Sequence, residues 1–263
     1  MKKLLLTVFL LPISLLASEI STYLKANYIK APALETALKA EGFEVLGAYD
    51  AMGDSKHHII VITNADLKKA ASEEKRGFAG VLKVLVDAEK NTLVVTNPEY
   101  FMHAFLQDDY KEDKAKSITS SLSKAMGSFT NSKLSLDDDD LEGYHYMFGM
   151  PYYEDMVEVA EGEHLAQKLE KNAGANLVFK LDLGKSVVYG IAMPIEKEYI
   201  AAIEAQDHAA FLPYMVMIED GEAKILHGKY YLAISNPGLS MGAFMKISST
   251  PGEIEDFMTA LFK

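Results

Sequence analysis

The sequence predicts an α+β fold in two tandem copies, each with the order helix–strand–strand–helix–strand–strand–helix. The stretches TNPEYFMHAFL (96–106) and SNPGLSMGAFM (235–245) both carry Asn-Pro followed by Met, Ala and Phe at the same offsets. The segments that precede these two stretches also correspond to one another in order. A signature that recurs 139 residues later, behind matching segments, indicates a duplicated architecture.

The first copy begins with a predicted helix that ends at Gly42. Its apolar residues Leu34, Ala37 and Leu38 recur at helical spacing. Two further parts follow: a β-rich run with a turn residue and a charged helix start, and then two strands around an acidic turn. Each part has a counterpart later in the chain, and the three pairs are 32–50 with 163–184, 57–71 with 186–202, and 80–98 with 214–237.

We interpret the shared Asn-Pro as a corner at which a strand ends and the last helix of each copy begins. Proline cannot donate to a β-ladder, but it suits the first turn of a helix. The Met and Phe residues that follow would lie on that helix, where such side chains usually belong to the core. Four residues are therefore predicted to be buried at equivalent corners: Met102, Phe105, Met241 and Phe244.

The chain divides into four predicted parts. It opens with Lys2 and Lys3, a short apolar run and the small residue Ala17, which is typical of a secretory signal peptide cut after Ala17. The apolar run is too short to span a bilayer. A polar, turn-like stretch later separates the two copies. The predicted parts are a signal peptide at 1–17, a first domain at 18–129, an acidic linker at 130–149 and a second domain at 150–263.

Composition excludes several classes of function. The chain has no cysteine, which excludes disulfides, thiolate metal sites, covalently attached haem and cysteine nucleophiles. The formal charge is −12, and loss of Lys2 and Lys3 with the leader would make it −14. Repulsion then excludes nucleic acid as a partner. We expect a periplasmic protein with no membrane span, held together by its core.

The quoted segments also resemble a known family. LETALKAEGFEVLGAYD, followed by a strand, a charged helix and LKVLVDAEKNTLVVTNP, is similar to the DUF302 family of small bacterial domains. The match is clearest over 28–108 and weaker over 160–246, where Ala175-Asn176-Leu177 replaces the Gly-Phe of the family. The resemblance implies antiparallel sheets and a tendency to dimerise, so a tandem copy suggests an intramolecular pseudo-dimer. It implies no reaction and no catalytic residues.

The densest group of candidate ligands lies in YHYMFGMPYYEDM (144–156). Thioether and imidazole groups suit Cu(I) and could also hold haem iron without covalent attachment, so His145, Met147 and Met150 form an alternative metal site. Met and Tyr side chains also form ordinary apolar contacts, and we favour this packing role over a metal site. The turn formers Gly149 and Pro151 argue against a helix that would align the two sulfurs.

Histidines in the first copy form a second candidate site. His57 and His58 are adjacent on a predicted strand, so they point to opposite faces and cannot easily chelate one metal ion together. One of them could approach His103. The acidic run at 137–140 lacks the ligand spacing of an EF-hand loop and is expected to be a solvated linker.

These observations predict a non-catalytic binding or interaction protein with an apolar cleft between the two copies. The residues expected to bind the ligand are Met102, His103, Tyr144, Tyr146 and Tyr152. The expected partner is a small apolar ligand or a periplasmic protein, and the chain could also form a homodimer. No cofactor is expected. The alternative is a periplasmic copper or haem protein that uses the Met and His residues around 145–156.

Overall fold

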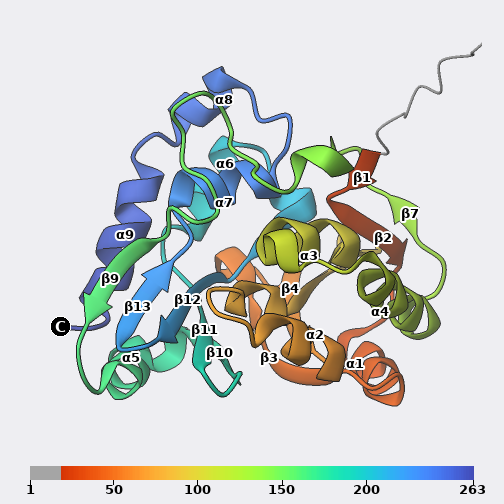
Figure 1. Cartoon of the computed structure of the whole chain (residues 1–263). Coiled ribbons are helices and arrows are strands. Elements are labelled where there is room, and N and C mark those ends of the chain that lie inside the picture. The colour runs from red at the N-terminus through yellow and green to blue at the C-terminus, as the bar shows by residue number, and fades with distance from the viewer. Residues whose placement is uncertain (1–18) are drawn as a thin grey trace, which may run out of the picture.

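A computed structural model describes residues 19–263, so the predicted signal peptide lies outside the described residues. The first half of the chain forms an antiparallel sheet with the order β3-β4-β5-β6-β2-β7 (Figure 1). Its strands are β2 (Tyr23–Asn27), β3 (Glu44–Asp50), β4 (His57–Thr63), β5 (Leu82–Asp87), β6 (Thr92–Thr96) and β7 (Thr130–Asn131). Its helices are α1 (Ala31–Ala40), α2 (Ala65–Ala71), α3 (Pro98–Leu106) and α4 (Glu112–Met126).

The second half forms another antiparallel sheet, with the order β10-β11-β12-β13-β9. Its strands are β9 (Val157–Glu161), β10 (Leu177–Asp182), β11 (Ser186–Ile191), β12 (Tyr214–Glu219) and β13 (Glu222–Ile225). Its helices are α5 (Leu165–Ala173), α6 (Glu196–Ala202), α7 (Gly228–Ser235), α8 (Met241–Lys246) and α9 (Thr250–Ala260). The prediction of an α+β fold with antiparallel sheets is confirmed.

The two sheets follow the same path of the chain. In each sheet, four strands pair in chain order, as two hairpins joined by a helical connection, and an earlier strand, β2 or β9, pairs with the last of them. The first hairpin of each sheet carries a β-bulge near its start, between Val45 and Gly47 in one case and between Leu177 and Phe179 in the other. The edge strands β3 and β10 approach each other, and the buried apolar side chains of both halves belong to one core.

The predicted corner is correct in the first half and wrong in the second. Asn97 is the single residue between β6 and α3 and caps that helix, and Pro98 is its first residue. In the second half, the segment 214–237 is predicted to form two strands around an acidic turn that lead to Asn-Pro, but its residues 228–235 form the helix α7. Asn236 then caps the C-terminal end of α7, and Pro237 lies between α7 and α8.

The error has a physical reason. The residues of α7 from Tyr230 to Ser235 are all buried, so the segment is apolar on every side and shows no helical period in its sequence. Its β-branched and aromatic residues then favour a strand on propensity alone. The N-terminus of α7 is capped by a less familiar residue, because the His227 ring accepts a hydrogen bond from the Lys229 amide at 3.1 Å.

Three of the four predicted corner residues are buried. Met102, Phe105 and Phe244 are 1%, 3% and 4% exposed. Met241 is 41% exposed, so its prediction is wrong. The reason is that Asn236-Pro237 follows α7 instead of beginning a core helix. Met241 is therefore the first residue of the short surface helix α8.

The segment predicted as an acidic linker begins with ordered strands. β7 adds to the first sheet beside β2, and β8 (Ser135–Asp137) pairs with β1 (Glu19–Ser21). Residues 130–137 therefore extend the first half and cover one end of its sheet. Over residues 19–263, no helix has the length and apolar character needed to cross a membrane.

Candidate functional site

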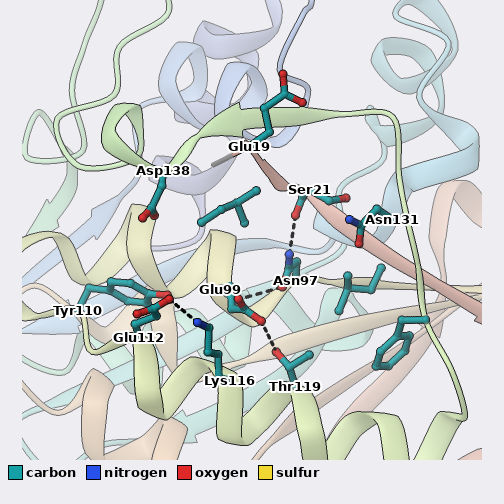
Figure 2. A pocket seen from close by; sticks show the side chains of 13 residues that line it. Glu19, Ser21, Asn97, Glu99, Tyr110, Glu112, Lys116, Thr119, Asn131 and Asp138 are labelled. Atoms are coloured by element: carbon teal, nitrogen blue, oxygen red, sulfur yellow. Dashed lines mark hydrogen bonds and ion pairs between the residues drawn. The ribbon is translucent and has the colours of Figure 1, made fainter. Parts of the chain in front are cut away.

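A pocket of about 350 Å³ opens where β1, β2 and residues 129–138 face α3 and α4 (Figure 2). Four carboxylates and one ammonium group line it, from Glu19, Glu99, Glu112, Asp138 and Lys116. We call this cavity the acidic pocket. Its apolar lining comes from Ile20, Leu24 and Phe129. The volume is within the range of small-molecule sites.

Asn97 holds together the two elements that meet at this pocket. Its side-chain amide donates a hydrogen bond to the Ser21 carbonyl on β1 at 2.6 Å, and its Oδ1 accepts one from the Glu99 amide at 3.1 Å. The corner that the sequence predicted at Asn97-Pro98 therefore places the first turn of α3 under β1. Glu99 lies in this first turn, where the helix dipole stabilises a negative charge.

The pocket carboxylates have polar contacts that hold them in place. Glu99 accepts a hydrogen bond from the Thr119 hydroxyl of α4 at 3.3 Å, as Figure 2 shows. Glu19 accepts one from Ser135 at 3.0 Å. Lys116 pairs with Glu112 one helical turn earlier. The ammonium group of the pocket is thus already engaged with one carboxylate, and the lining keeps an excess of negative charge.

Tyr110 lines the pocket, and the His103 ring stacks on it. His103 lies parallel to Tyr110, with 4.2 Å between ring centroids, and its Nδ1 is 2.8 Å from Asp138 Oδ1. Burial raises the pKa of Tyr110 well above its usual range, and the nearby charges of Glu99, Asp138 and Glu112 raise it further. The Tyr110 hydroxyl therefore stays protonated at neutral pH and can donate or accept a hydrogen bond.

This arrangement suits an organic cation. Carboxylates are strong acceptors for ammonium or guanidinium donors, and the apolar side of the pocket can cover a short carbon chain. Among residues 19–263, no group of three or more His, Asp or Glu side chains is arranged to hold a metal ion.

The residues predicted to bind a ligand do not form one site. Met102 lines a separate pocket of about 280 Å³ between α2 and α3. His103 does not line the acidic pocket itself but contacts two residues that do, Tyr110 and Asp138. Tyr144 and Tyr146 pack on the second half, against Tyr230 and Phe244. Tyr152 is 45% exposed and lies beside His145.

The residues of the alternative metal site are also spread over the structure. His57 and His58 each contact their own carboxylate, Asp54 at 3.5 Å and Asp50 at 2.8 Å. His103 contacts Asp138 instead.

In the segment around His145, Met147 and Met150 are joined by a backbone hydrogen bond of 2.9 Å, from the Met150 amide to the Met147 carbonyl. Met147 and Met150 therefore lie in a turn rather than on one face of a helix. Copper or haem binding stays a prediction.

The contact between the two halves is closely packed. Side chains from both halves, among them Lys83, Phe105, Met215 and Tyr231, line a cavity of about 10 Å³. A space of this size holds one water molecule at most. Lys83 is 3% exposed, and its Nζ is 2.7 Å from the Phe211 carbonyl, 2.8 Å from the Pro213 carbonyl and 2.9 Å from the Tyr231 hydroxyl. A ligand larger than water needs another site.

The carboxylates of the acidic pocket were missed in the sequence. They lie at positions 19, 99, 112 and 138, and nothing in a chain with 38 acidic residues marks them as a group. Two signals were available. Glu99 directly follows the Asn-Pro corner, and Asp138 belongs to the acidic run at 137–140, which was interpreted as a solvated linker.

The comparisons with known proteins give no further guidance. No family model, no curated protein and no solved structure matches this chain. The similarity to DUF302 domains therefore stays a prediction, and the functional argument depends on the geometry described above.

Proposed function

We propose that this protein is an exported, non-catalytic binding protein that holds a small organic cation in the acidic pocket. The ligand class is an amine or guanidinium on a short carbon chain. The single observation that supports this best is the lining of the pocket, in which four carboxylates face one lysine that is already paired with Glu112. An uncharged or anionic ligand would leave this negative charge without compensation.

We also propose that the two halves are tandem copies of one ancestral unit, joined as an intramolecular pseudo-dimer. Three observations support the proposal: the common strand order, the matching bulges in the first hairpins, and the approach of the two equivalent edge strands β3 and β10. The corresponding region of the second half has no β1–β8 ribbon. The acidic pocket is then a feature that one copy acquired.

The proposed function is tested by calorimetric titration of the mature protein with 1,5-diaminopentane, spermidine and arginine. The neutral analogue 1,5-pentanediol serves as the matched probe without charge. We expect at least one amine or guanidinium to bind, and the diol not to bind. Affinity should fall as ionic strength increases, because added salt screens charge–charge attraction.

Variants locate the binding site. Glu99→Gln and Asp138→Asn each remove a charge from the pocket with little change in shape, and we expect each to weaken binding about tenfold or more. Glu163→Gln removes the same charge from a side chain that is 94% exposed, and should leave affinity unchanged. Equal loss in all three variants, or equal binding of the diol, would contradict the proposal.

A further inference from the structure

The exposed large apolar side chains of residues 19–263 gather in one region. They are Met147, Phe148, Tyr152, Met241 and Met245, with exposures of 40%, 102%, 45%, 41% and 60%. Three belong to the segment 144–152 and two to α8. Surface clusters of this kind on a monomer usually mark interaction sites. We call these five side chains the apolar patch.

Specific contacts join the two segments that carry the patch. The Tyr146 ring stacks on the Phe244 ring at a centroid distance of 5.0 Å, and the Tyr146 hydroxyl donates a hydrogen bond to the Leu239 carbonyl. Figure 1 shows the green segment that precedes β9 running beside α8 at one end of the molecule. The two segments that carry the patch are therefore in contact, although they lie far apart in the sequence.

A tight turn presents the most exposed side chain. The Met150 amide donates to the Met147 carbonyl at 2.9 Å, and Gly149 has a φ of 76°, which L-residues rarely adopt. Met147 and Phe148 are thus held at the tip of an ordered turn. The Phe148 side chain is fully exposed and therefore contributes nothing to the core.

Negative charge lies on the segment that leads into the patch. A pocket of about 250 Å³ is lined by Asp139, Asp140 and Glu142, together with Tyr144 and His145. Among the ion pairs of residues 19–263, none involves these three carboxylates. An apolar surface and an unpaired acidic pocket therefore follow one another along the same segment.

We propose that the apolar patch docks a basic amphipathic segment of a partner protein. Apolar side chains of the partner would pack on Phe148 and the flexible Met side chains, which adapt to varied shapes. A Lys or Arg of the partner would enter the pocket lined by Asp139, Asp140 and Glu142. Charge favours a basic segment over two other binding partners. A second copy of this chain would bring its own carboxylates against these carboxylates, and an anionic membrane would repel them.

The test uses fluorescence anisotropy with two labelled peptides of the same helical pattern, one of Lys and Leu and the other of Glu and Leu. We expect the wild-type protein to bind the Lys/Leu peptide and not the Glu/Leu peptide. Phe148→Ser combined with Met245→Ser should weaken binding about tenfold or more, as should Asp139→Asn combined with Asp140→Asn. All four substituted side chains are exposed, so these variants should fold.

Two controls separate this site from the acidic pocket. Glu99→Gln and Glu163→Gln should leave the affinity for the Lys/Leu peptide unchanged. Undiminished binding to the Phe148→Ser/Met245→Ser variant would overturn the proposal. So would a wild-type dimer, measured by light scattering, that the same variant converts to a monomer, or binding to anionic phosphatidylglycerol vesicles that the variant loses.

Discussion

Tyr100 and Tyr230 donate reciprocal hydrogen bonds across the contact between α3 and α7. The Tyr100 hydroxyl donates to the Ile234 carbonyl at 2.8 Å, and the Tyr230 hydroxyl donates to the Ala104 carbonyl at 3.1 Å. Each tyrosine lies three residues after its helix cap, Asn97 or His227, and each acceptor lies seven residues after the other cap. A twofold interface has this pattern, in which residue i contacts j and j contacts i. The pattern supports the proposed pseudo-dimer.

These two bonds predict a matched pair of effects. Tyr100→Phe and Tyr230→Phe should each lower the free energy of unfolding by about 0.5–1.5 kcal/mol, because each removes one buried hydrogen bond and little volume. Tyr152→Phe, at an exposed side chain, should have no measurable effect. Urea denaturation of the three variants measures the difference. A neutral result for one tyrosine beside a clear loss for the other would contradict an equivalent role.

The same contact explains why the sequence could predict the fold class but not the register of the proposed repeat. The quoted signature matches Asn97-Pro98 with Asn236-Pro237. The structure instead has His227-Gly228 in the position of Asn97-Pro98, since each pair follows the second strand of a hairpin, β6 or β13, and begins the next helix. A histidine cap leaves no recognisable motif. The Asn-Pro at 236–237 therefore has the same sequence as Asn97-Pro98 but a different position in the fold, at the end of a helix.

The acidic pocket was less predictable than the fold. Its carboxylates meet because β8 folds back on β1 and brings Asp138 next to His103. Short strands of this kind have no periodic pattern that is long enough to recognise. Glu99 could be placed at a helix start from the sequence, but its neighbours across the pocket depend on tertiary contacts alone.

Burial at the corners gives the second prediction. Phe105 is 3% exposed. The centroid of its ring lies 5.9 Å from the Tyr153 ring centroid and 6.3 Å from the Tyr231 ring centroid. Phe105→Ala should therefore lower the free energy of unfolding by about 3–5 kcal/mol. Met241→Ala, at an exposed position of α8, should change it by less than about 0.5 kcal/mol. Denaturant melts of both variants measure the contrast, and similar losses would contradict the burial described here.

Gly47 gives the third prediction, because it lies where β3 approaches β10. A Cβ atom at this position would be 2.0 Å from the Val178 carbonyl oxygen. Gly47→Ala should therefore force the two edge strands apart and lower the thermal midpoint. Gly252→Ala is the matched control, since a Cβ there meets no atom within 4 Å and alanine favours the helix α9. A Gly47→Ala variant as stable as the control would show that the halves are not in close contact at these strands.

Lys83 gives the last prediction, which concerns pH. Burial lowers the pKa of the Lys83 ammonium well below its usual range, and the attraction of Glu196 opposes this only in part. In the unfolded chain the same group keeps an ordinary pKa of about 10.4. Between the two pKa values the unfolded chain binds more protons than the folded protein, so the contribution of Lys83 to stability increases as the pH rises through this window.

Lys83→Met removes this dependence and introduces a side chain of the type that faces Lys83 from the second half, Met215. The stability of the variant relative to wild type should therefore grow as the pH falls within the window, by up to about 1.4 kcal/mol per pH unit. Urea denaturation at pH values from neutral to 9.5 measures the two curves, and staying below 10 avoids titration of tyrosines in the unfolded chain. Lys197→Met, at an exposed side chain, should give a curve parallel to wild type. If the Lys83→Met curve were also parallel, the folded protein would keep Lys83 charged, held by the Phe211 and Pro213 carbonyls and the Tyr231 hydroxyl.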